Sequence, residues 1–348
     1  MQNNIVNKSI LLIAEPFYGY DETIKNELLR LGARSVYLKN DVYYAGNIKA
    51  RFNWYNLINW VKNPQVRKKW TDSFKKEIEG KKFDTLFVVE VLPFSKNFID
   101  YIRAIQPNIR IILFLWDSLR TRQSRFIDYF PKFNKVYSFD RDDALKFHLN
   151  YFPDFYIETT LPSFADCKYD IAFVGTMNST LTIFRGQILK KIDDFCKNEG
   201  LKTFFYLRYF APQKANNFIR RIISFVSNYR YRKKLQRLNG CDFMHEESLP
   251  LLVYNDVMSN TRVVLDINHH DRQGMTINAI TAIALGKKLI TTNKRIAEED
   301  FYDPKMICII DENNPKLDLD FFNAPNIPID MSKLRLDNWL LHVVNEEE

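Results

Sequence analysis

The sequence predicts an α/β protein with two domains, each built on a parallel β-sheet that helices cover on both faces. Three observations support this prediction. The chain has 348 residues, enough for two hydrophobic cores. Short apolar runs alternate with segments of helical spacing along most of its length, which is typical of parallel sheets. The alternation breaks once, in the proline-containing stretch 151–168, and then resumes.

The first half, residues 1–160, alternates from its first apolar run onward. A helix at 21–31 has acidic residues in its first turn and Gly32 just after its end, and Asp140 is placed to cap a helix that runs toward His148. The other expected elements are strands at 10–14, 83–90, 110–116 and 135–139 and a helix at 95–105. Together these elements predict a doubly wound domain.

The second half, residues 161–328, repeats the pattern. A strand at 169–174 and a loop at 175–180 lead into a helix at 181–197, which Gly200 ends. The other expected strands lie at 202–207, 262–267, 288–292 and 306–310. The tail, residues 329–348, carries an apolar stripe, so we expect a helix there that packs back on the first domain.

Both halves are thus expected to be Rossmann-like domains. In open sheets of this kind, ligands bind outside the carboxyl ends of the strands. Two such domains that face each other across a cleft suit an enzyme that joins two substrates, one held by each domain.

The composition limits the partners and the location. A hydrophobic fraction of 46%, with 28 Phe and 18 Tyr, excludes a disordered chain. A formal net charge of +8 favours an anionic partner, such as nucleic acid, anionic lipid or a nucleotide. The four cysteines are widely spaced, which indicates neither a zinc site nor a disulfide framework. No signal peptide or spanning segment is visible, so we expect a cytoplasmic protein, soluble or peripheral at the inner face of the membrane.

The segment 262–293 contains a strand, a polar loop, a glycine, a helix, a second glycine and a strand, an arrangement that directs a helix N-terminus at an anion. Gly274 lets a diphosphate approach the backbone closely, and the Thr276 hydroxyl can donate to it. The full set of candidate contacts is Gln273, Gly274, Met275, Thr276 and Asn278. The alternative is an ordinary turn into a core helix that Thr276 only caps.

Six motifs then occur in one order between Ser9 and Phe322. They are LLIAEPFYGYDETIKNEL, FLWDS, VYSFDRDDA, YDIAFVGT followed by Arg185, QGMT, and GKKLITTN followed by Asp300, Phe301 and Tyr302. In this order they resemble the bacterial cell-surface polysaccharide glycosyltransferases, often labelled lipopolysaccharide biosynthesis proteins and related to the spore-maturation glycosyltransferases. The resemblance implies a GT-B fold, in which the C-terminal domain binds a nucleotide-sugar donor, the N-terminal domain binds the acceptor, and no metal is required.

Two positions depart from the pattern of that family. In that family the helix that corresponds to 275–285 usually carries a Glu five residues before the glycine that ends it, and this carboxylate binds the ribose hydroxyls. In this sequence the position is occupied by Thr281. Asn278 stands where related sequences often carry Arg. Losing a charge-assisted contact of about 1.5–3 kcal/mol weakens donor binding about ten- to a hundredfold, unless Asp266 or Asn268 replaces it. Both departures favour an alternative, a catalytically silent GT-B-like binding protein.

The loop after the first strand of the second half is another phosphate candidate. Gly175 and Thr176 follow the strand, and Arg185 lies one to two turns into the next helix, within reach of a leaving diphosphate. The alternative for Arg185 is an ion pair with a surface carboxylate. His269 and His270 can hydrogen-bond the sugar or a phosphate, and no carboxylate or cysteine at ligand spacing supports a metal site there.

Transfer to a hydroxyl group calls for a base, and three carboxylates of the first half follow expected strands. They are Glu15, Glu90 and Asp117, of which Glu90 and Asp117 rank above Glu15. Asp117 follows Trp116, whose ring can stack on a sugar or fill the core. The alternative for each carboxylate is a capping or other structural role, and an enzyme that retains anomeric configuration needs no such base.

The stretch 218–238 contains seven basic residues and no acidic one. It can lie on an anionic membrane surface, where each basic charge contributes about 1 kcal/mol, or it can be a solvated helix with one apolar face on its own domain. A similar choice applies to three tryptophans among basic residues in the first half. They either contact the acceptor or a membrane, or belong to an amphipathic helix packed on the first sheet. The residues are Trp54, Trp60 and Trp70 with Lys62, Arg67, Lys68 and Lys69.

The sequence therefore predicts a metal-independent glycosyltransferase without a cofactor. It transfers a sugar from a nucleotide-sugar donor to a saccharide or lipid-linked acceptor in lipopolysaccharide or capsule biosynthesis. We expect no nucleic-acid partner, because no recognition helix, RNP motif or zinc module is visible. The expected donor-binding residues are Gly175, Thr176, Arg185, His270, Gln273, Gly274, Met275, Thr276, Asn278 and Thr281.

Overall fold

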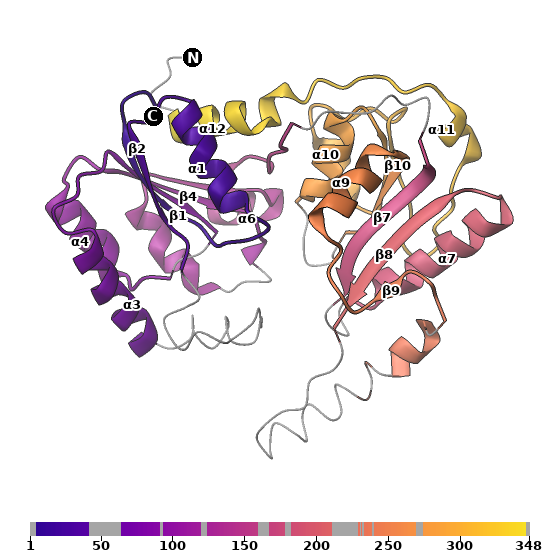
Figure 1. Ribbon diagram of the computed structural model, residues 1–348, viewed down its shortest axis with the longest axis horizontal. Helices are drawn as coiled ribbons and strands as arrows, with labels where there is room; N and C mark the ends of the chain where they lie inside the picture. Colours follow the sequence, from indigo (N-terminus) through magenta and orange to yellow (C-terminus); the bar gives the residue numbers. More distant parts are fainter. Residues whose placement is uncertain are drawn as a thin grey trace. The chain divides into compact units, whose positions relative to one another are not determined.

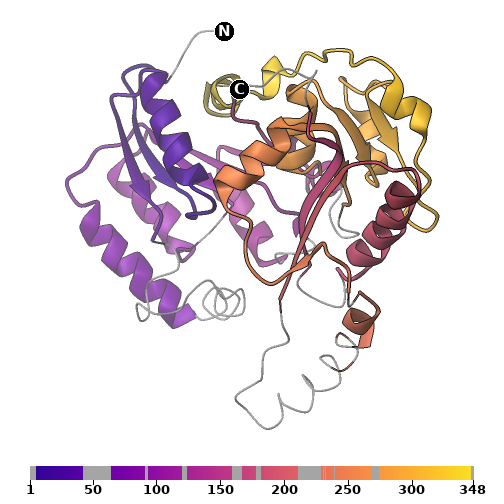
Figure 2. The ribbon, with the colours of Figure 1, turned by 45° about the vertical axis from the view of Figure 1, so that its right-hand side comes forward.

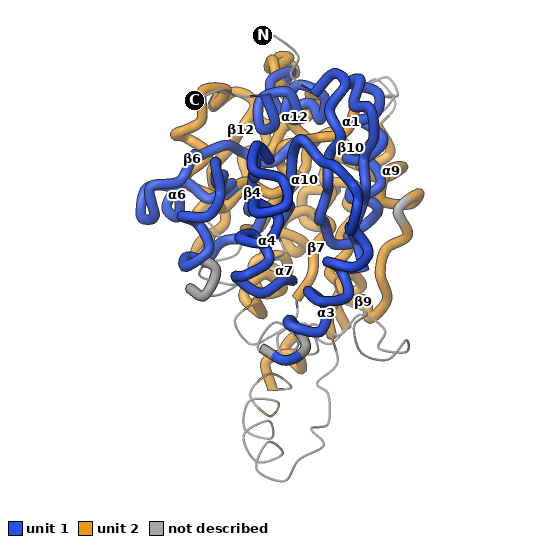
Figure 3. The backbone as a smooth tube through the Cα atoms, turned by 90° about the vertical axis from the view of Figure 1, so that its left-hand side faces the viewer, with its two compact units in different colours: residues 1–155, 271–274, 332–348 blue, residues 156–270, 275–331 orange. Residues whose placement is uncertain are grey.

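A computed structural model describes residues 5–41, 64–90, 93–119, 124–158, 167–177, 182–210, 229, 231, 233–238, 240–268 and 274–345. The chain forms two compact units (Figure 3). Unit 1 comprises residues 1–155, 271–274 and 332–348, and unit 2 comprises residues 156–270 and 275–331. The division passes between Phe155 and Tyr156. The domain boundary expected after residue 160 lies outside the described residues.

Unit 1 contains a sheet of six strands in the order β2-β1-β3-β4-β5-β6 (Figure 1). The strands are β1 (Ser9–Ile13), β2 (Ser35–Lys39), β3 (Thr85–Val89), β4 (Arg110–Leu115), β5 (Lys135–Ser138) and β6 (Asn150–Tyr151). All neighbouring strands are parallel. Every residue of β1 and β3 is buried, as expected for parallel strands covered on both faces.

Helices cover both faces of this sheet. They are α1 (Tyr20–Arg30), α3 (Pro64–Glu77), α4 (Asn97–Ile105), α6 (Arg141–Phe147) and α12 (Leu336–Asn345), with 3₁₀ turns at Ser124–Lys132 and Ser332–Leu334. Figure 1 shows α1 and α12 on one face and α3 and α4 on the other. Trp339 of α12 is fully buried beside Phe87 and Phe114, and its indole N–H donates to the Pro153 carbonyl at 2.9 Å. The helix α12 therefore completes the core of unit 1.

Unit 2 contains a second parallel sheet of six strands, in the order β12-β11-β10-β7-β8-β9. The strands are β7 (Tyr169–Met177), β8 (Thr203–Tyr209), β9 (Met244–His245), β10 (Thr261–Asp266), β11 (Lys288–Thr291) and β12 (Ile307–Ile309). The helices are α7 (Phe184–Asn198), α9 (Leu251–Ser259), α10 (Ile277–Ala284) and α11 (Leu319–Asn323), with 3₁₀ turns at Gln236–Leu238 and Lys294–Glu298. In Figure 1, α7 lies on one face of the sheet, and α9 and α10 lie on the other.

Local sequence signals confirm several expected element ends. Asp140 caps α6 by accepting hydrogen bonds from the amides of Asp142 and Asp143. Gly286, after α10, has a φ of 66°, the left-handed conformation that ends a helix. β7 extends to Met177, beyond the expected end at residue 174, because it continues to pair with β8. Across the described ranges, no helix combines the length and the apolar character needed to span a bilayer.

Candidate functional site

The strand order creates a switch point in each sheet. In unit 1 the order reverses between β1 and β3, and in unit 2 it reverses between β7 and β10. Open parallel sheets bind ligands outside the carboxyl ends of the strands at such a point. Glu15 and Glu90 follow β1 and β3, whereas Gly175, Thr176 and Asp266 lie toward the ends of β7 and β10. Both switch points therefore carry residues that the sequence singles out.

Glu90 holds the loop that follows β4. Its side chain is buried, and Oε2 accepts hydrogen bonds from the backbone N–H groups of Trp116 at 2.9 Å and Asp117 at 3.0 Å. The backbone of Glu90 has a φ of 64°, a left-handed conformation that costs an L residue about 1–2 kcal/mol. Because this carboxylate satisfies two amides, Glu90 is better suited to positioning Asp117 than to accepting a proton.

Two further buried carboxylates hold the same loop. The Ser118 hydroxyl donates to Asp140, which also caps α6, and the Leu119 N–H donates to Asp143 at 2.6 Å. Both acids lie at the N-terminus of α6, where the helix dipole stabilises negative charge. Residues 116–119 are therefore fixed by three separate carboxylates.

Asp117 and Glu15 lie at the same carboxyl edge of the sheet. Both are buried, with exposed fractions of 7% and 5%. The N–H of Asp117 donates to Glu90, which fixes its backbone at the end of β4. The carbonyl of Glu15 accepts the N–H of Phe17 at 2.8 Å, which fixes the loop after β1. A hydroxyl group that reaches this edge can lose its proton to either carboxylate.

Arg185 extends from α7 to the end of β7. Its guanidinium donates to the Thr176 carbonyl at 2.8 Å and lies over the Phe173 ring, 5.5 Å from its centroid. Gly175 permits this packing, because a Cβ there would lie 2.6 Å from the Phe173 ring and 3.2 Å from the guanidinium. The arrangement holds a buried positive charge at the switch point of unit 2, where it can stabilise a developing anion.

Asp266, the last residue of β10, organises the start of α10. Its carboxylate accepts hydrogen bonds from the hydroxyls of Thr276 and Thr291, each at 3.0 Å. Burial raises the pKa of Asp266 above its ordinary value. The nearby Arg185 charge and the two hydroxyls lower this pKa, but their effect is smaller than that of burial. The carboxylate that the sequence offers as a substitute for the ribose-binding Glu is therefore engaged inside unit 2.

Thr276 caps α10, the role that the alternative interpretation gave it. Its hydroxyl oxygen accepts the N–H of Ala279 at 3.1 Å while its proton goes to Asp266. A hydroxyl has only one proton to donate. Donation from Thr276 to a diphosphate would therefore require it to leave Asp266, and the donor role of Thr276 stays a prediction. Met275, the preceding residue, is buried.

The two departures from the family pattern differ in their surroundings. Asn278 accepts the Tyr254 hydroxyl at 2.7 Å and donates to the Val174 carbonyl at 3.2 Å, so it joins α10 to α9 and to β7. Thr281 lies in the middle of α10 and is partly exposed. Asn278 therefore has a structural role at the switch point that a ligand would have to share.

Gly274 packs against Phe139, which follows β5, and both residues belong to unit 1. A Cβ at Gly274 would lie 2.4 Å from the Phe139 ring and 2.7 Å from its carbonyl oxygen. The close approach that this glycine permits is thus made by a protein side chain. A diphosphate can reach Gly274 from that side only if the phenyl ring moves, and its role in donor binding stays a prediction.

The two lysines that follow Gly286 do not lie at the ligand end of the sheet. They stand at the start of β11, opposite its carboxyl end. The Lys287 ammonium donates to the carbonyls of Ser259 and Thr261, and that of Lys288 donates to two carbonyls at the end of α11. Burial lowers the pKa of both groups. Their role is to satisfy buried carbonyl groups.

His270 and Gln273 lie outside the described residues, as does most of the stretch 218–238. The described end of that stretch is amphipathic. Tyr231 and Leu238 are buried in the core of unit 2, whereas Lys233 and Lys234 are exposed. These contacts fit a surface helix on its own domain, and contact with a membrane stays a prediction.

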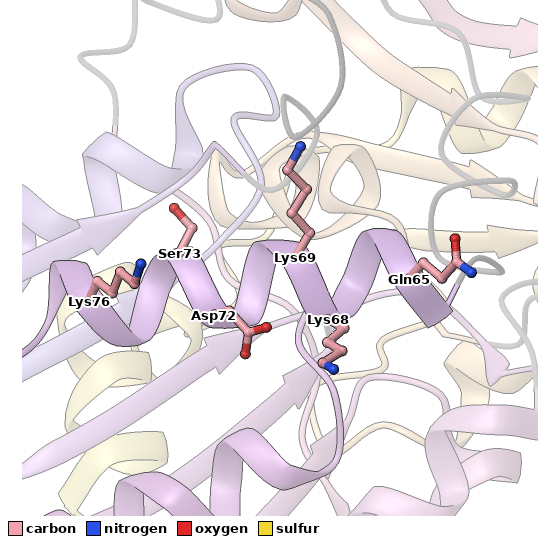
Figure 4. A pocket seen from close by; sticks show the side chains of 6 residues that line it. All are labelled: Gln65, Lys68, Lys69, Asp72, Ser73 and Lys76. Atoms are coloured by element: carbon pink, nitrogen blue, oxygen red, sulfur yellow. The ribbon is translucent and has the colours of Figure 1, made fainter.

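The helix α3 shows the same division. Trp70 is buried against Phe74, and Arg67 donates to the Phe94 carbonyl, so both belong to the packing of unit 1. On its exposed side the helix borders an open pocket of about 440 Å³ (Figure 4). The pocket is lined by Gln65, Lys68, Lys69, Asp72, Ser73 and Lys76. This basic surface is separate from the residues at the switch point of unit 1.

The loop that joins β1 to α1 lies within the first of the six motifs, and its aromatic residues were assigned no role from the sequence. There Phe17 and Tyr18 expose their rings, and Tyr18 and Gly19 have φ values of 50° and 79°. The signal available in the sequence was a pair of aromatic residues before a glycine, directly after a buried strand. For metals, the described residues contain no group of three or more His, Cys, Asp or Glu placed to hold an ion.

Comparison with protein families and with curated proteins found no match. Solved structures do match. An α,α-trehalose-phosphate synthase (UDP-forming) from Burkholderia vietnamiensis has a TM-score of 0.53 and 10% identity over 89% of this chain and 87% of its own. An α-glucosyltransferase solved with UDP and a 13-mer DNA has a TM-score of 0.51 and 12% identity over 97% and 94%.

A putative UDP-N-acetylglucosamine 2-epimerase from Listeria monocytogenes also matches, with a TM-score of 0.50 and 10% identity over 98% of this chain and 96% of its own. These matches confirm the expected fold class, a GT-B-like α/β protein with two Rossmann-like domains. Fold and reaction are separate properties, so the residues at the switch points have to carry the functional argument.

Proposed function

We propose that this protein is a glycosyltransferase that moves a sugar from a nucleotide-sugar donor, bound by unit 2, to an acceptor bound by unit 1. The observation that carries the proposal is the position of the candidate residues. In unit 1, Glu15 and Glu90 follow the two strands between which the order reverses, and Asp117 follows the neighbouring strand β4. In unit 2, the buried Arg185 lies at the end of β7. The structural neighbours include enzymes named for forming UDP or solved with UDP or UDP-2-fluoroglucose, which supports a nucleotide-sugar donor.

On the donor side, Arg185 supplies the positive charge that a leaving diphosphate requires. The guanidinium is fixed by Thr176 and Phe173. A fixed charge needs little reorganisation as the anion develops, which is the main advantage of such groups in catalysis. The first turn of α10 adds a helix N-terminus beside the same strand ends.

On the acceptor side, we assign Asp117 the role of the base and Glu90 that of a positioning residue. Glu90 holds the amides of Trp116 and Asp117, so the Asp117 backbone has a fixed place at the edge of the sheet. An acceptor hydroxyl within hydrogen-bonding reach of the Asp117 carboxylate would lose its proton as the new glycosidic bond forms. Glu15 is the second candidate for this role.

Two finer parts of the proposal rest on the sequence resemblance: a saccharide or lipid-linked acceptor in lipopolysaccharide or capsule assembly, and catalysis without a metal. A third part, a cytoplasmic protein that contacts an anionic membrane, rests on the seven basic residues of 218–238. Binding to vesicles with and without anionic lipid, compared between the wild type and a variant with neutral residues at Lys233 and Lys234, tests the membrane contact. Activity that survives EDTA supports metal independence, and activity that requires added Mg²⁺ or Mn²⁺ contradicts it.

The central test separates donor binding from transfer. The protein is mixed with UDP-, GDP-, dTDP- and CMP-sugars, and its thermal unfolding is followed. A rise in unfolding temperature with one nucleotide class is expected, because a ligand that binds the folded state stabilises it. Release of the nucleotide in the presence of a saccharide acceptor then identifies transfer; the released nucleotide is a nucleoside diphosphate from UDP-, GDP- and dTDP-sugars and CMP from CMP-sugars. No shift with any sugar nucleotide at millimolar concentration would contradict the proposal.

The alternative is a GT-B-like protein that binds a sugar nucleotide without transferring the sugar. Thr281 and the engagement of Asn278 with Tyr254 and Val174 favour it, because neither position offers the charged contact of the related enzymes. A thermal shift without product in any acceptor mixture would identify this silent binder.

A further inference from the structure

Three aromatic rings gather at the switch point of unit 1. Phe17 and Tyr18, in the loop between β1 and α1, form an edge-to-face pair with centroids 4.6 Å apart. The centroid of the Phe17 ring also lies 6.1 Å from that of the Trp116 ring. The backbone N–H of Trp116 donates to Glu90. We call Phe17, Tyr18 and Trp116 the aromatic platform. It links the loop after β1 to the loop after β4, next to the carboxylates already described.

The two outer rings of the platform are exposed. Phe17 is 36% exposed and Tyr18 56%, whereas Trp116 is 9% exposed. Large aromatic side chains normally bury most of their surface when a fold can use them. The proposed roles of Glu90 and Asp117 make no use of these rings. A ring that packs on its neighbours from one side and is open on the other is suited to a ligand.

Backbone strain marks the same place. Tyr18 has a φ of 50° and is followed by Gly19 at 79°, so two successive left-handed residues turn the chain after β1. Glu90, after the neighbouring strand β3, is left-handed as well. The other left-handed non-glycine residues in the described ranges are Asn7 and His148. Strained residues of this kind gather at ligand sites, where the surrounding structure keeps them in place.

The loop beneath the platform is firmly held. The Tyr20 N–H donates to the Phe17 carbonyl at 3.0 Å, and the Tyr20 ring lies edge-on to Trp116 and Phe155. Burial, with a contribution from Asp154, raises the pKa of Tyr20 to about 12. Tyr20 is therefore a neutral part of the packing at physiological pH, and the platform is preorganised before any ligand arrives.

We propose that the aromatic platform binds one pyranose ring of a saccharide acceptor, an inference that rests on the proposed function and names its acceptor class. A pyranose presents an apolar face of C–H groups and a rim of hydroxyls. The more exposed ring, Tyr18, can stack on the former, and Phe17, at 81° to it, supports that ring from the side. The carboxylate of Asp117, next to Trp116, can accept a hydrogen bond from the latter.

The charges around the platform argue for a neutral ligand. Glu15 and Asp117 follow β1 and β4, the strands that carry the platform, and Glu90 follows β3 between them. Like charges in a shared site repel one another. A diphosphate or an anionic lipid headgroup would meet these carboxylates, whereas a neutral sugar can use them as hydrogen-bond acceptors. A saccharide is thus the ligand class that satisfies both the rings and the charges.

Saturation-transfer NMR tests this inference without any nucleotide. The probes are methyl glycosides of glucose, galactose, mannose and N-acetylglucosamine and the corresponding disaccharides. We expect at least one probe to bind the wild type through the C–H protons of one ring face. In Tyr18→Gly its Kd should rise about tenfold, because the apolar contact with one ring is lost. Tyr18→Phe keeps the ring and should bind within about twofold of the wild type.

Glycine is the safe replacement because it adopts a φ of 50° without strain. His148→Gly is the matched control: it relieves the same kind of strain at the end of α6 and should leave saccharide binding unchanged. A wild type that binds no saccharide, or a Tyr18→Gly, Phe17→Ala double variant that binds as well as the wild type, overturns the inference. Loss of sugar-nucleotide binding in Tyr18→Gly also overturns it, since the platform would then hold the donor.

The failure of this inference differs from the failure of the proposed function. The proposed function fails when no sugar nucleotide shifts the thermal unfolding of the wild type. The platform is tested by saccharides alone, so its result stands in either case. Donor binding without saccharide binding rejects the platform and leaves the proposed donor site intact.

Discussion

The two units have similar sheets and opposite chemistry at their switch points. In unit 1 the loops carry Glu15, Glu90 and Asp117, all buried carboxylates. In unit 2 the corresponding place carries Arg185 and the carboxylate of Asp266, whose charge two hydroxyls and the guanidinium help to offset. The fold thus sets the place at which a ligand can bind, and the side chains set the charge that the ligand can have.

The comparison also separates two ways of holding a loop. In unit 1, carboxylates bind backbone amides directly, and Glu90 does so from a strained backbone. In unit 2, the hydroxyls of Thr276 and Thr291 donate to the Asp266 carboxylate, and Arg185 donates to the Thr176 carbonyl. The backbone of Thr276 is relaxed. Carboxylates that bind amides form a rigid, acidic edge suited to a neutral acceptor. The network in unit 2 keeps a positive charge available for a diphosphate.

The largest effect is expected for the proposed base. Asp117→Asn should lower the rate of transfer about 10²- to 10⁴-fold, the usual contribution of general-base catalysis. The affinity for the sugar nucleotide should not change, because Asp117 belongs to unit 1. Initial rates and donor thermal shifts measure the two properties. Asp128→Asn, at an exposed carboxylate of unit 1 paired with Lys96, is the control and should keep near-normal activity.

Transfer at a normal rate in Asp117→Asn would show that Asp117 is not the base and would make Glu15 the candidate for that role. Loss of donor binding in the same variant would contradict the division of roles between the units.

The second effect concerns the stability of the acidic edge. Glu90→Ala should lower the free energy of unfolding by about 2–5 kcal/mol, because two buried amides lose their acceptor. Glu90→Gln should cost less than about 2 kcal/mol, since both amides donate to one oxygen, which a glutamine can supply. Denaturant unfolding measures both variants. If Glu90 is a positioning residue, Glu90→Gln also keeps most of the activity, and an inactive but stable Glu90→Gln would instead identify Glu90 as the base.

The third effect concerns the basic side. Arg185→Gln should weaken binding of the nucleoside diphosphate about ten- to a hundredfold, because a hydrogen bond to a charged group contributes about 1.5–3 kcal/mol. Isothermal titration with UDP and GDP measures the change. Lys190→Gln, an exposed position on the same helix, removes one positive charge without touching the site and is the matched control. Equal affinities in the two variants would show that Arg185 does not meet the phosphates.

The smallest effect is a pH dependence. The folded-state pKa of Asp266 lies above the unfolded value of 3.8, so the folded protein binds more protons between the two values. The contribution of Asp266 to stability is therefore present below pH 3.8 and is lost as the pH rises through the folded pKa, with a slope of at most about 1.4 kcal/mol per pH unit. Asp266→Asn lacks this dependence.

Unfolding temperatures of the wild type and Asp266→Asn, compared at several pH values from 4 upward, test this sign. The variant should gain stability relative to the wild type as the pH rises. A relative loss with rising pH would mean that the charged form of Asp266 is the one the fold favours, and the two units would then be alike in stabilising buried carboxylates.

Much of the fold could be predicted from the sequence because its central strands are continuous apolar runs bounded by helix signals. The strand at 110–116 and the helix cap at Asp140 agree with the structure to within a residue. The missed elements include β2, β6, β9, α9 and α11. β2 is a short strand with polar ends that is only partly buried, and α9 begins with the run LLVY, which has no helical spacing.

The candidate site was predictable in its location and less so in its contacts. A carboxylate or a glycine after a buried strand can be read from the sequence, because parallel strands bring their carboxyl ends to one edge. The hydrogen-bond partners of Glu90 and Asp266 and the packing partner of Gly274 could not be read, since they lie 26–27, 10–25 and 135 positions away along the chain. Such pairs are set by tertiary packing alone.

The burial of Trp339 in unit 1 has a consequence for biosynthesis. Residues 332–345 leave the ribosome only after the whole of unit 2, yet they fill the space between Phe87, Phe114 and Phe155. The nascent first unit therefore lacks this part of its core until the second unit has been translated. A chain that ends before Trp339 has a first unit without the indole that packs between these three rings.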